Sequence, residues 1–173
     1  MDLPSQYKWL TKESAPTMLV KGLELYGTTE TAGNVNNPVI LSWAAECGLP
    51  SYNADSIPWC GLFIAVVAKR CFKKIPANAL WARSWLAFGD MCDPELGCVL
   101  VFSREGGGGH VGLYVGQDSD CYHVLGGNQG DKVSITRIKK DRLIGSRAEY
   151  VSKPLSVRKV ILAASGQVST NEA

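Results

Sequence analysis

The sequence has no hydrophobic run long enough to cross a membrane. Its longest apolar stretch, WCGLFIAVVA at residues 59–68, ends at two basic residues and falls well short of the roughly 18 to 20 apolar residues of a membrane span. The first residues, MDLPSQYKWLTKES, also lack the basic start and the apolar segment of a secretory signal. We therefore expect a protein that is made in the cytoplasm and has no integral membrane segment.

An excess of one charge sign is also absent. The chain of 173 residues carries 18 Lys and Arg against 16 Asp and Glu, a formal net charge of +2. This excess is too small for a nucleic-acid-binding protein, although it is compatible with a weakly anionic partner such as a bacterial cell wall. With 46% hydrophobic and 20% charged residues the composition is that of a globular protein, and the length favours one domain over 1–173.

The six cysteines are not spaced as in a known disulfide framework. Without a secretory signal they are not expected to form disulfides, and no two of them have the C-x-x-C spacing of a structural zinc site. Histidine is rarer, with two residues, His110 and His123. Any chemistry that needs an imidazole must therefore use one of these two side chains.

The first half of the chain has the pattern of helices. Residues 15–27 place apolar side chains at helical spacing and end at a glycine, and residues 36–50 do the same between a proline and a glycine. A third helix is expected to begin near Asp55 or Ser56, both good capping residues, and to continue to about residue 72. Because this third helix is apolar on all sides, it must be covered on most of them.

The second half has short β-rich runs separated by turn residues. These runs are residues 97–102, 110–116, 121–125 and 132–138. Their connections are too short for crossover helices and so predict an antiparallel meander. Residues 157–164 are expected to add a strand and residues 165–173 to be frayed, which leaves a core of about 15–165. Helices followed by strands predict an α+β fold, with the buried third helix packed on an antiparallel sheet.

Cys60 lies where the third helix begins, in the stretch IPWCGLF. Unpaired N–H groups and the positive end of the helix dipole stabilise a thiolate there, which lowers the pKa of a cysteine. Cysteine is also among the residues most often buried in a core, so this position alone does not make Cys60 a nucleophile. A cysteine nucleophile further needs a base within hydrogen-bond reach, usually histidine, and a third group that orients the imidazole.

Of the two histidines, His110 is the better candidate for the base. It opens a strand directly after four glycines, beside a loop that can admit a substrate, and Gly112 on the same face leaves space next to its ring. His123 lies in the middle of a strand, where a structural role is the more common outcome. Downstream, Asn128 and Gln129 end the strand that is expected to neighbour His110, although Gly and Asn also favour turns for backbone reasons alone.

Three motifs in this order, DSIPWCGLFIAVVAKRC, GHVGLYVG and VLGGNQGDKVSI, together resemble one known family. The chain is similar to the CHAP-type cysteine, histidine-dependent amidohydrolases and peptidases, within the larger NlpC-like, papain-related superfamily. The most similar members are compact versions encoded by tailed bacteriophages. The resemblance covers about residues 19–147 and implies a papain-like fold with a buried, nucleophile-bearing helix on an antiparallel sheet.

This resemblance implies a set of catalytic residues. Cys60 matches the nucleophile, and His110 matches the base at the start of a core strand. In CHAP-like members the orienting residue follows the histidine by one hairpin, which matches Asn128. Other branches place it earlier in that strand, which would match His123. We favour Asn128, because it belongs to the GGNQ motif.

Three more residues, Trp59, Asp55 and Gln129, are candidates for substrate binding. Trp59 and Asp55 match the family motif around the nucleophile, where Trp59 would form a wall of the cleft and Asp55 would cap the helix. A structural role is an equally good interpretation for these two. Gln129 belongs to the same GGNQ motif as Asn128.

The function implied by the resemblance is that of an endolysin. Such an enzyme hydrolyses an amide bond of bacterial peptidoglycan, as an N-acetylmuramoyl-L-alanine amidase or an endopeptidase, through an acyl-enzyme on Cys60, and so lyses the host. We expect no metal or cofactor, no nucleic-acid partner, and a monomer that reaches the wall from the periplasm after release through a holin. The alternatives are a tail-associated hydrolase or a secreted antibacterial amidase toxin, and, in another class, a non-catalytic wall-binding domain that retains the fold.

Overall fold

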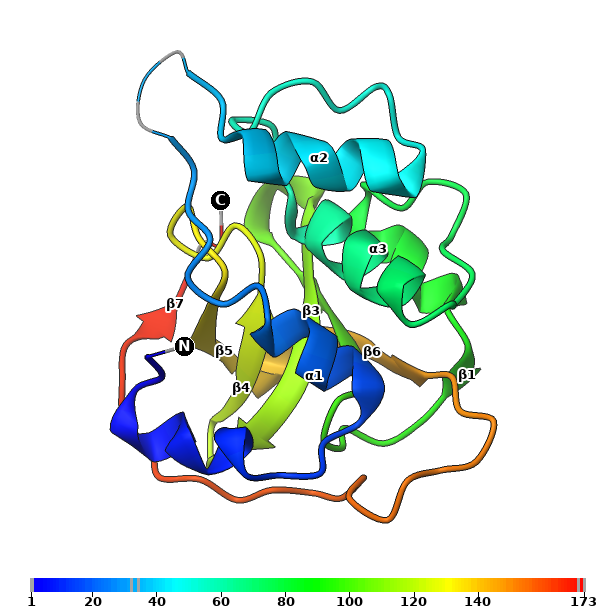
Figure 1. Ribbon diagram of the computed structural model, residues 1–173. Coiled ribbons are helices and arrows are strands. Elements are labelled where there is room, and N and C mark those ends of the chain that lie inside the picture. Colours follow the sequence, from blue (N-terminus) through cyan, green and yellow to red (C-terminus); the bar gives the residue numbers. More distant parts are fainter. Residues whose placement is uncertain (1, 32, 34, 171, 173) are drawn as a thin grey trace.

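The computed structural model describes residues 2–31, 33, 35–170 and 172, and its α-helices precede its sheet along the chain (Figure 1). The α-helices are α1 (Thr17–Leu23), α2 (Pro38–Cys47) and α3 (Cys60–Arg70). Short 3₁₀ helices occupy Ser5–Thr11, Ala82–Ala87, Glu105–Gly107 and Lys140–Arg142. Within the described ranges, no helix is long and apolar enough to pass through a bilayer.

The second half of the chain forms one seven-stranded sheet. Its strands are β1 (Asp90–Met91), β2 (Val99–Ser103), β3 (Gly109–Gln117), β4 (Cys121–Gly126), β5 (Ser134–Lys139), β6 (Leu143–Ala148) and β7 (Val168–Ser169). Their order is β1-β6-β2-β3-β4-β5-β7, and every pair is antiparallel except β5 with β7. N-terminal helices packed on a mostly antiparallel sheet confirm the predicted α+β class.

α2 begins and ends at the residues that its sequence signals predict. The side chain of Asn37 accepts a hydrogen bond from the N–H of Val39 at 2.8 Å, and Pro38 occupies the first turn. Gly48 ends the helix with a φ of 68°, a left-handed conformation that glycine adopts without strain. Both signals act locally, which is why the sequence alone is enough to locate this helix.

α3 begins later than predicted, at Cys60 rather than near Asp55 or Ser56. The reason is that the Asp55 carboxylate does not cap this helix. It accepts hydrogen bonds from the N–H groups of Asn37 at 2.7 Å and Thr31 at 3.1 Å, and so holds the loop that leads into α2. As a result Cys60 is the first residue of α3, closer to its exposed N–H groups than the predicted start implied.

The predicted meander matches β2 to β5, but the sheet extends beyond it. β6 returns to pair with β2, with Ser146 opposite Leu100. Residues 157–164, predicted as a strand, form an isolated bridge between Ile161 and Gln117, whereas the predicted frayed end contains β7. These two predictions for the end of the chain are wrong, because pairing there depends on distant partners that local composition does not reveal.

α3 lies between α2 and the sheet. It packs on β3 and β4 with one side and on α2 with the other, and all of its residues up to Ala68 are buried, as its all-round apolar character predicts. Within β2, Val99 and Val101 join the helix-side core, while Leu100 and Phe102 belong to a second cluster on the opposite face. The start of α3 is therefore held firmly against the sheet.

Candidate active site

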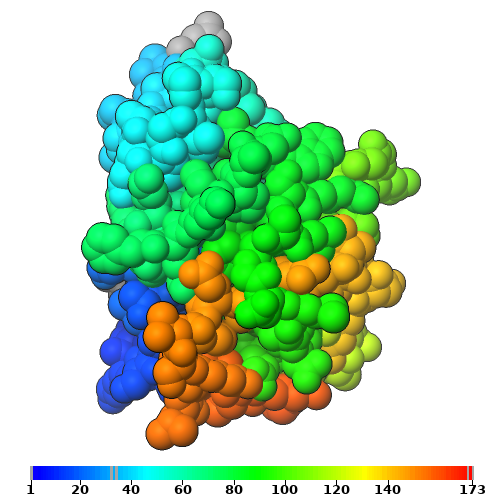
Figure 2. Space-filling view, turned by 90° about the vertical axis from the view of Figure 1, so that its right-hand side faces the viewer, coloured from blue at the N-terminus to red at the C-terminus, as the bar shows by residue number. Residues whose placement is uncertain are grey.

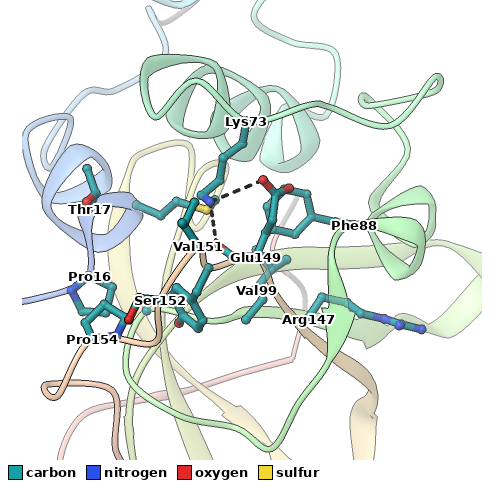
Figure 3. A pocket seen from close by; sticks show the side chains of 14 residues that line it. Pro16, Thr17, Lys73, Phe88, Val99, Arg147, Glu149, Val151, Ser152 and Pro154 are labelled. Carbon is teal, nitrogen blue, oxygen red and sulfur yellow. Dashed lines mark hydrogen bonds and ion pairs between the residues drawn. The ribbon is translucent and has the colours of Figure 1, made fainter.

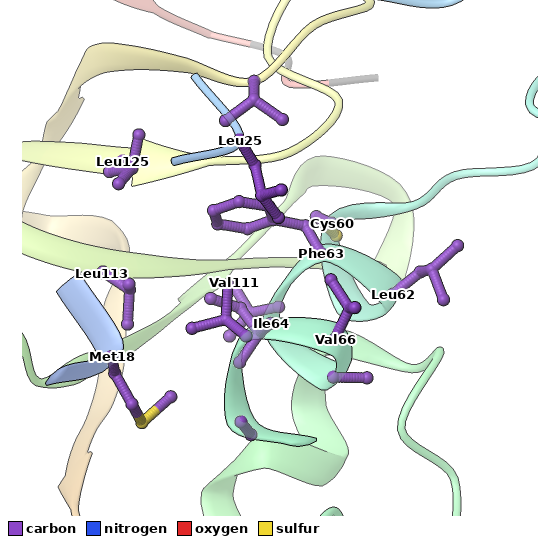
Figure 4. Packing of buried hydrophobic residues seen from close by; sticks show 14 of the residues in the cluster. Met18, Leu25, Cys60, Leu62, Phe63, Ile64, Val66, Val111, Leu113 and Leu125 are labelled. Carbon is purple, nitrogen blue, oxygen red and sulfur yellow. The ribbon is translucent and has the colours of Figure 1, made fainter. Parts of the chain in front are cut away.

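Cys60 lies at the start of α3, where the helix meets β3 (Figure 4). The backbone N–H groups of Gly61 and Val111 act on its sulfur and favour the thiolate by lowering the pKa of Cys60. Val111 directly follows His110 in β3, so the backbone of the predicted base comes close to the predicted nucleophile, whereas the His110 side chain lies on the sheet face of its strand partner Phe102. Both side chains are covered, with Cys60 7% exposed and His110 1% exposed.

The ring of His110 is held by Gln129. His110 Nε2 lies 3.0 Å from the side-chain oxygen of Gln129. The amide nitrogen of Gln129 donates to the carbonyl oxygens of Ser134 at 2.6 Å and Val124 at 3.2 Å, which turns the amide oxygen towards the ring. Because that oxygen can only accept, Nε2 carries the proton, and in the neutral ring Nδ1 has the lone pair of a base.

The residue that contacts His110 is therefore Gln129 and not Asn128, the predicted orienting residue. Asn128 has a φ of 57°, a left-handed conformation in the turn after β4. This turn carries the chain back towards β5, where the N–H of Gln129 donates to the carbonyl of Lys132. The turn thus directs the side-chain amide of Gln129, and not that of Asn128, towards the His110 ring. This outcome depends on the φ angle of Asn128.

The two glycines before Asn128 allow the strand end to pass close to the site. A Cβ at Gly126 would lie 2.9 Å from His110 Nε2 and 2.7 Å from the Gln129 oxygen. A Cβ at Gly127 would lie 2.7 Å from the indole ring of Trp59. The GGNQ motif therefore combines two close approaches with the residue that holds the imidazole. By contrast, Gly112 does not leave the open space expected beside His110, since a Cβ there would meet a side-chain carbon of Val124 at 2.4 Å.

Burial sets the protonation state of the site. It raises the pKa of the Cys60 thiol and outweighs the backbone hydrogen bonds that favour the thiolate. Burial also lowers the pKa of His110 to about 4, against the opposing effects of the Glu172 charge and the Gln129 hydrogen bond. The thiolate predicted from the helix start is therefore disfavoured in this covered state, which at neutral pH holds a neutral thiol and a neutral imidazole.

The other two candidates for substrate binding have internal contacts. Trp59 is fully buried, packs on Trp43 with ring centroids 5.9 Å apart, and donates its indole N–H to Glu30 at 2.6 Å. Asp55 is 3% exposed and holds the loop before α2, as described above. Both residues shape the surroundings of Cys60, Trp59 by supporting Gly127, and neither faces solvent.

His123 lies away from this junction in a separate buried network. Its Nδ1 is 2.6 Å from the hydroxyl of Tyr7, and its Nε2 is 2.9 Å from the carboxylate of Asp118. Arg137 donates to the same carboxylate at 2.8 Å. Burial alone would raise the pKa of Asp118, but these bonds and two backbone N–H donors hold it well below its usual range. The network ties the N-terminal 3₁₀ helix to β4 and β5.

Two charged residues beside the site were not candidates from the sequence. Glu172 is 1% exposed, and its carboxylate forms a two-pronged pair with Arg142, with N–O distances of 2.8 and 2.7 Å. The charges of both residues act on His110, and that of Glu172 also acts on Cys60. No local pattern marks either residue, since their proximity to the site comes from the crossover into β6 and from the pairing of β7.

A cavity of about 180 Å³ lies at the other end of α3 (Figure 3). Lys73 enters it and lies 3.6 Å from the carboxylate of Glu149, and Phe88 and Pro154 form parts of its wall. Figure 2 shows the face on which the segment after β6, in orange, lies against the green middle of the chain. Because α3 has 11 residues, its ends are about 15 Å apart, so this cavity is separate from Cys60.

The groups at the junction suit nucleophilic and proton-transfer chemistry. They are a thiol, an imidazole of fixed tautomer, and backbone N–H groups at a helix start. Among the residues that the structure describes, no group of three or more His, Cys, Asp or Glu side chains could hold a metal ion.

Comparison of the chain with protein-family models, with curated proteins and with solved structures finds no match. Function must therefore be inferred from the geometry of Cys60, His110 and Gln129, together with the resemblance of the three sequence motifs.

Proposed function

We propose that this protein is a cysteine hydrolase that cleaves an amide bond of bacterial peptidoglycan, with Cys60 as nucleophile, His110 as base and Gln129 as the residue that orients the ring. One observation carries this proposal. The N–H of Val111 acts on the sulfur of Cys60 at the start of α3, and the residue before Val111 is a histidine whose Nε2 proton is held by Gln129. This arrangement leaves Nδ1 as the basic nitrogen.

Acylation begins when the substrate enters the site and reaches the buried His110 ring. His110 Nδ1 takes the proton of the Cys60 thiol, and the sulfur attacks the carbonyl carbon of the scissile amide. The negative charge that develops on the carbonyl oxygen is stabilised by N–H groups at the start of α3, which have no partners within the helix. Gln129 stabilises the imidazolium through its oxygen, although less strongly than a carboxylate would.

The same groups complete acylation and then carry out deacylation. The imidazolium donates its Nδ1 proton to the leaving amine, which departs and leaves the acyl group on Cys60 as a thioester. The neutral ring then removes a proton from water, whose oxygen attacks the thioester. The acid product leaves, and the proton returns to the Cys60 sulfur.

The substrate and the delivery route of the proposal come from the resemblance to compact phage enzymes. We infer an endolysin with amidase or endopeptidase activity that acts as a monomer on the wall after release through a holin. The small positive net charge of +2 is compatible with an anionic wall. A tail-associated hydrolase or a secreted amidase toxin would use the same chemistry at the same residues.

The proposal is tested by mass spectrometry of purified peptidoglycan after digestion. Wild-type protein is compared with Cys60→Ala and with Cys71→Ala, which removes a half-buried thiol just beyond the other end of α3. We expect new muramyl or peptide termini with wild type and Cys71→Ala, and none with Cys60→Ala. Identical fragments from wild type and Cys60→Ala would exclude Cys60 as the nucleophile, and intact peptidoglycan in all three digests would favour a non-catalytic wall-binding domain.

A further inference from the structure

The pair of Glu172 and Arg142 lies beside the proposed catalytic residues. Two features set it apart from two further two-pronged pairs of arginine and glutamate, Arg158 with Glu13 and Arg70 with Glu46, whose arginine side chains are 47% and 30% exposed. The Glu172 side chain is completely buried, and that of Arg142 is 18% exposed. A charge pair this deeply buried gives little net stability to a fold, because both ions lose their hydration.

The position of Arg142 does not depend on Glu172 alone. Its Nε donates to the carbonyl oxygen of Ser103 at 3.0 Å, and the Ser103 hydroxyl donates to the carbonyl oxygen of Arg142 at 3.2 Å. The next residue, Leu143, pairs with Phe102 in β2, and Phe102 pairs with His110 in β3. The guanidinium is therefore held at the end of the sheet where His110 lies. Its two terminal nitrogens, Nη1 and Nη2, face the Glu172 carboxylate.

The segment that carries Glu172 runs along the same end of the sheet. Residues 167–170 and Gln129 together line a hollow of about 340 Å³. The carbonyl oxygen of Ser169 accepts from Arg142 at 3.4 Å. Gly130, in the loop that follows β4, lines the same hollow. The chain thus places one of its own carboxylates at the proposed site.

Building on the proposed function, we propose that Arg142 is the anchor of a carboxylate-binding subsite, which Glu172 fills in this structure and which a carboxylate of an acidic peptide substrate fills during turnover. A planar guanidinium with two parallel N–H donors matches a carboxylate and orients it. While Glu172 occupies this position it excludes a carboxylate of the substrate, so Glu172 acts as an internal competitor of the substrate.

The subsite can be probed through the alkylation rate of Cys60 by two small reagents. Iodoacetate carries a carboxylate and iodoacetamide is its neutral analogue, so the ratio of their rates reports attraction of an anion to the site. Cys92 would compete for both reagents, because the hydrogen bond from Cys98 lowers the pKa of Cys92 to about 7. The rates are therefore measured by peptide mapping in a Cys92→Ser background.

We expect Glu172→Ala to raise the alkylation of Cys60 by both reagents and to raise the ratio of the iodoacetate rate to the iodoacetamide rate by about fivefold, as for one favourable charge contact. Adding Arg142→Gln should return the ratio to its starting value, and Arg142→Lys should retain part of the increase if Arg142→Gln disturbs folding. Glu13→Gln, which breaks the exposed pair, is the matched control and should change neither rate.

An unchanged ratio in folded Glu172→Ala protein overturns the subsite, whatever the activity on peptidoglycan. A raised ratio that Arg142→Gln abolishes supports it, even if no peptidoglycan fragment is ever released, because the readout needs Cys60 only as a thiol. Failure of the subsite and failure of the proposed function are thereby separated.

Discussion

The two histidines of this protein lie on neighbouring strands but near opposite ends of the sheet. His110 is the second residue of β3, whereas His123 pairs with Gly116 near the far end of that strand. Both are buried, and burial lowers the pKa of both. They differ in what their nitrogens contact. Both ring nitrogens of His123 are in hydrogen bonds, to Tyr7 and Asp118, while Gln129 is the only side chain among the described residues that bonds the ring of His110.

This difference shows that a carboxylate beside a histidine does not identify a catalytic base. The pair of His123 and Asp118 has the composition of a catalytic dyad, but Nδ1 of His123 accepts from Tyr7, so no lone pair is left to take a proton from a substrate or a thiol. His110 has a weaker partner, yet the residue that follows it, Val111, lies close to the Cys60 thiol at the start of α3. We therefore assign stability to the His123 end of the sheet and chemistry to the His110 end.

The largest effect on stability is expected at the His123 end. Asp118→Ala should lower the free energy of unfolding by about 3 to 5 kcal/mol, because it leaves the largely buried Arg137 charge and the His123 ring without their shared partner. Urea unfolding followed by tryptophan fluorescence measures this change. The exposed neighbour Asp120 is the control, and Asp120→Ala should shift the free energy by less than about 0.5 kcal/mol. Equal effects of the two substitutions would contradict the structural role of the network.

The pH dependence of stability should report the burial of His110. Its folded pKa of about 4 lies below the unfolded value of about 6.5, so the unfolded chain takes up a proton first as the pH falls. The stabilisation is complete above about pH 6.5 and is lost towards pH 4, by about 3 kcal/mol for this one group.

Urea unfolding at pH 7 and pH 4.5 tests this expectation, with His110→Gln as the comparison. The substitution should make the loss of stability between the two pH values smaller. His123 also has a lowered pKa and titrates in the same direction, so some pH dependence should remain in His110→Gln. If the free energy of unfolding changed equally with pH in wild type and in His110→Gln, His110 would not be buried as a neutral ring.

A smaller effect, on activity rather than stability, is expected at Gln129. Gln129→Leu removes the acceptor of the His110 Nε2 proton and should lower kcat/KM on peptidoglycan by about 10- to 100-fold, equivalent to one lost hydrogen bond of a buried group. Gln129→Glu should shift the pH profile upwards, because a carboxylate stabilises the imidazolium. A profile that does not move in Gln129→Glu would argue against a contact between this side chain and the catalytic ring.

The smallest effect is expected at Asn128, the neighbour of Gln129. Asn128 has a φ of 57°, and glycine tolerates this angle without strain. Asn128→Gly should therefore change the free energy of unfolding by less than about 1 kcal/mol and leave kcat/KM within about twofold of wild type. A loss of turnover in Asn128→Gly with Gln129→Leu still active would reverse our assignment of the two amides.

Features that depend on neighbouring residues could be predicted from the sequence. Asn37, Pro38 and Gly48 define the ends of α2, and the alternation in β2 to β5 gives the meander. The position of Cys60 at a helix start and of His110 at a strand start follow from the same local signals. The role of His110 rather than His123 as the base stays a prediction.

Features that depend on distant contacts or on one backbone angle could not be predicted. The left-handed conformation of Asn128 decides which amide meets His110, and the pattern GGNQ is equally compatible with either. Asp55 is a good capping residue by type, but the loop before α2 competes for its carboxylate. The burial of Glu172 depends on Arg142, which precedes it by thirty residues.

The most direct test of this account compares His110→Ala with His123→Ala on purified peptidoglycan, with rates expressed per folded molecule. We predict that His110→Ala lowers the release of fragments by about a hundredfold or more, as expected for loss of a general base, while its fold remains intact. His123→Ala should lower the unfolding midpoint and leave the rate per folded molecule close to wild type. Full activity of folded His110→Ala, or loss of activity in His123→Ala only, would contradict the account.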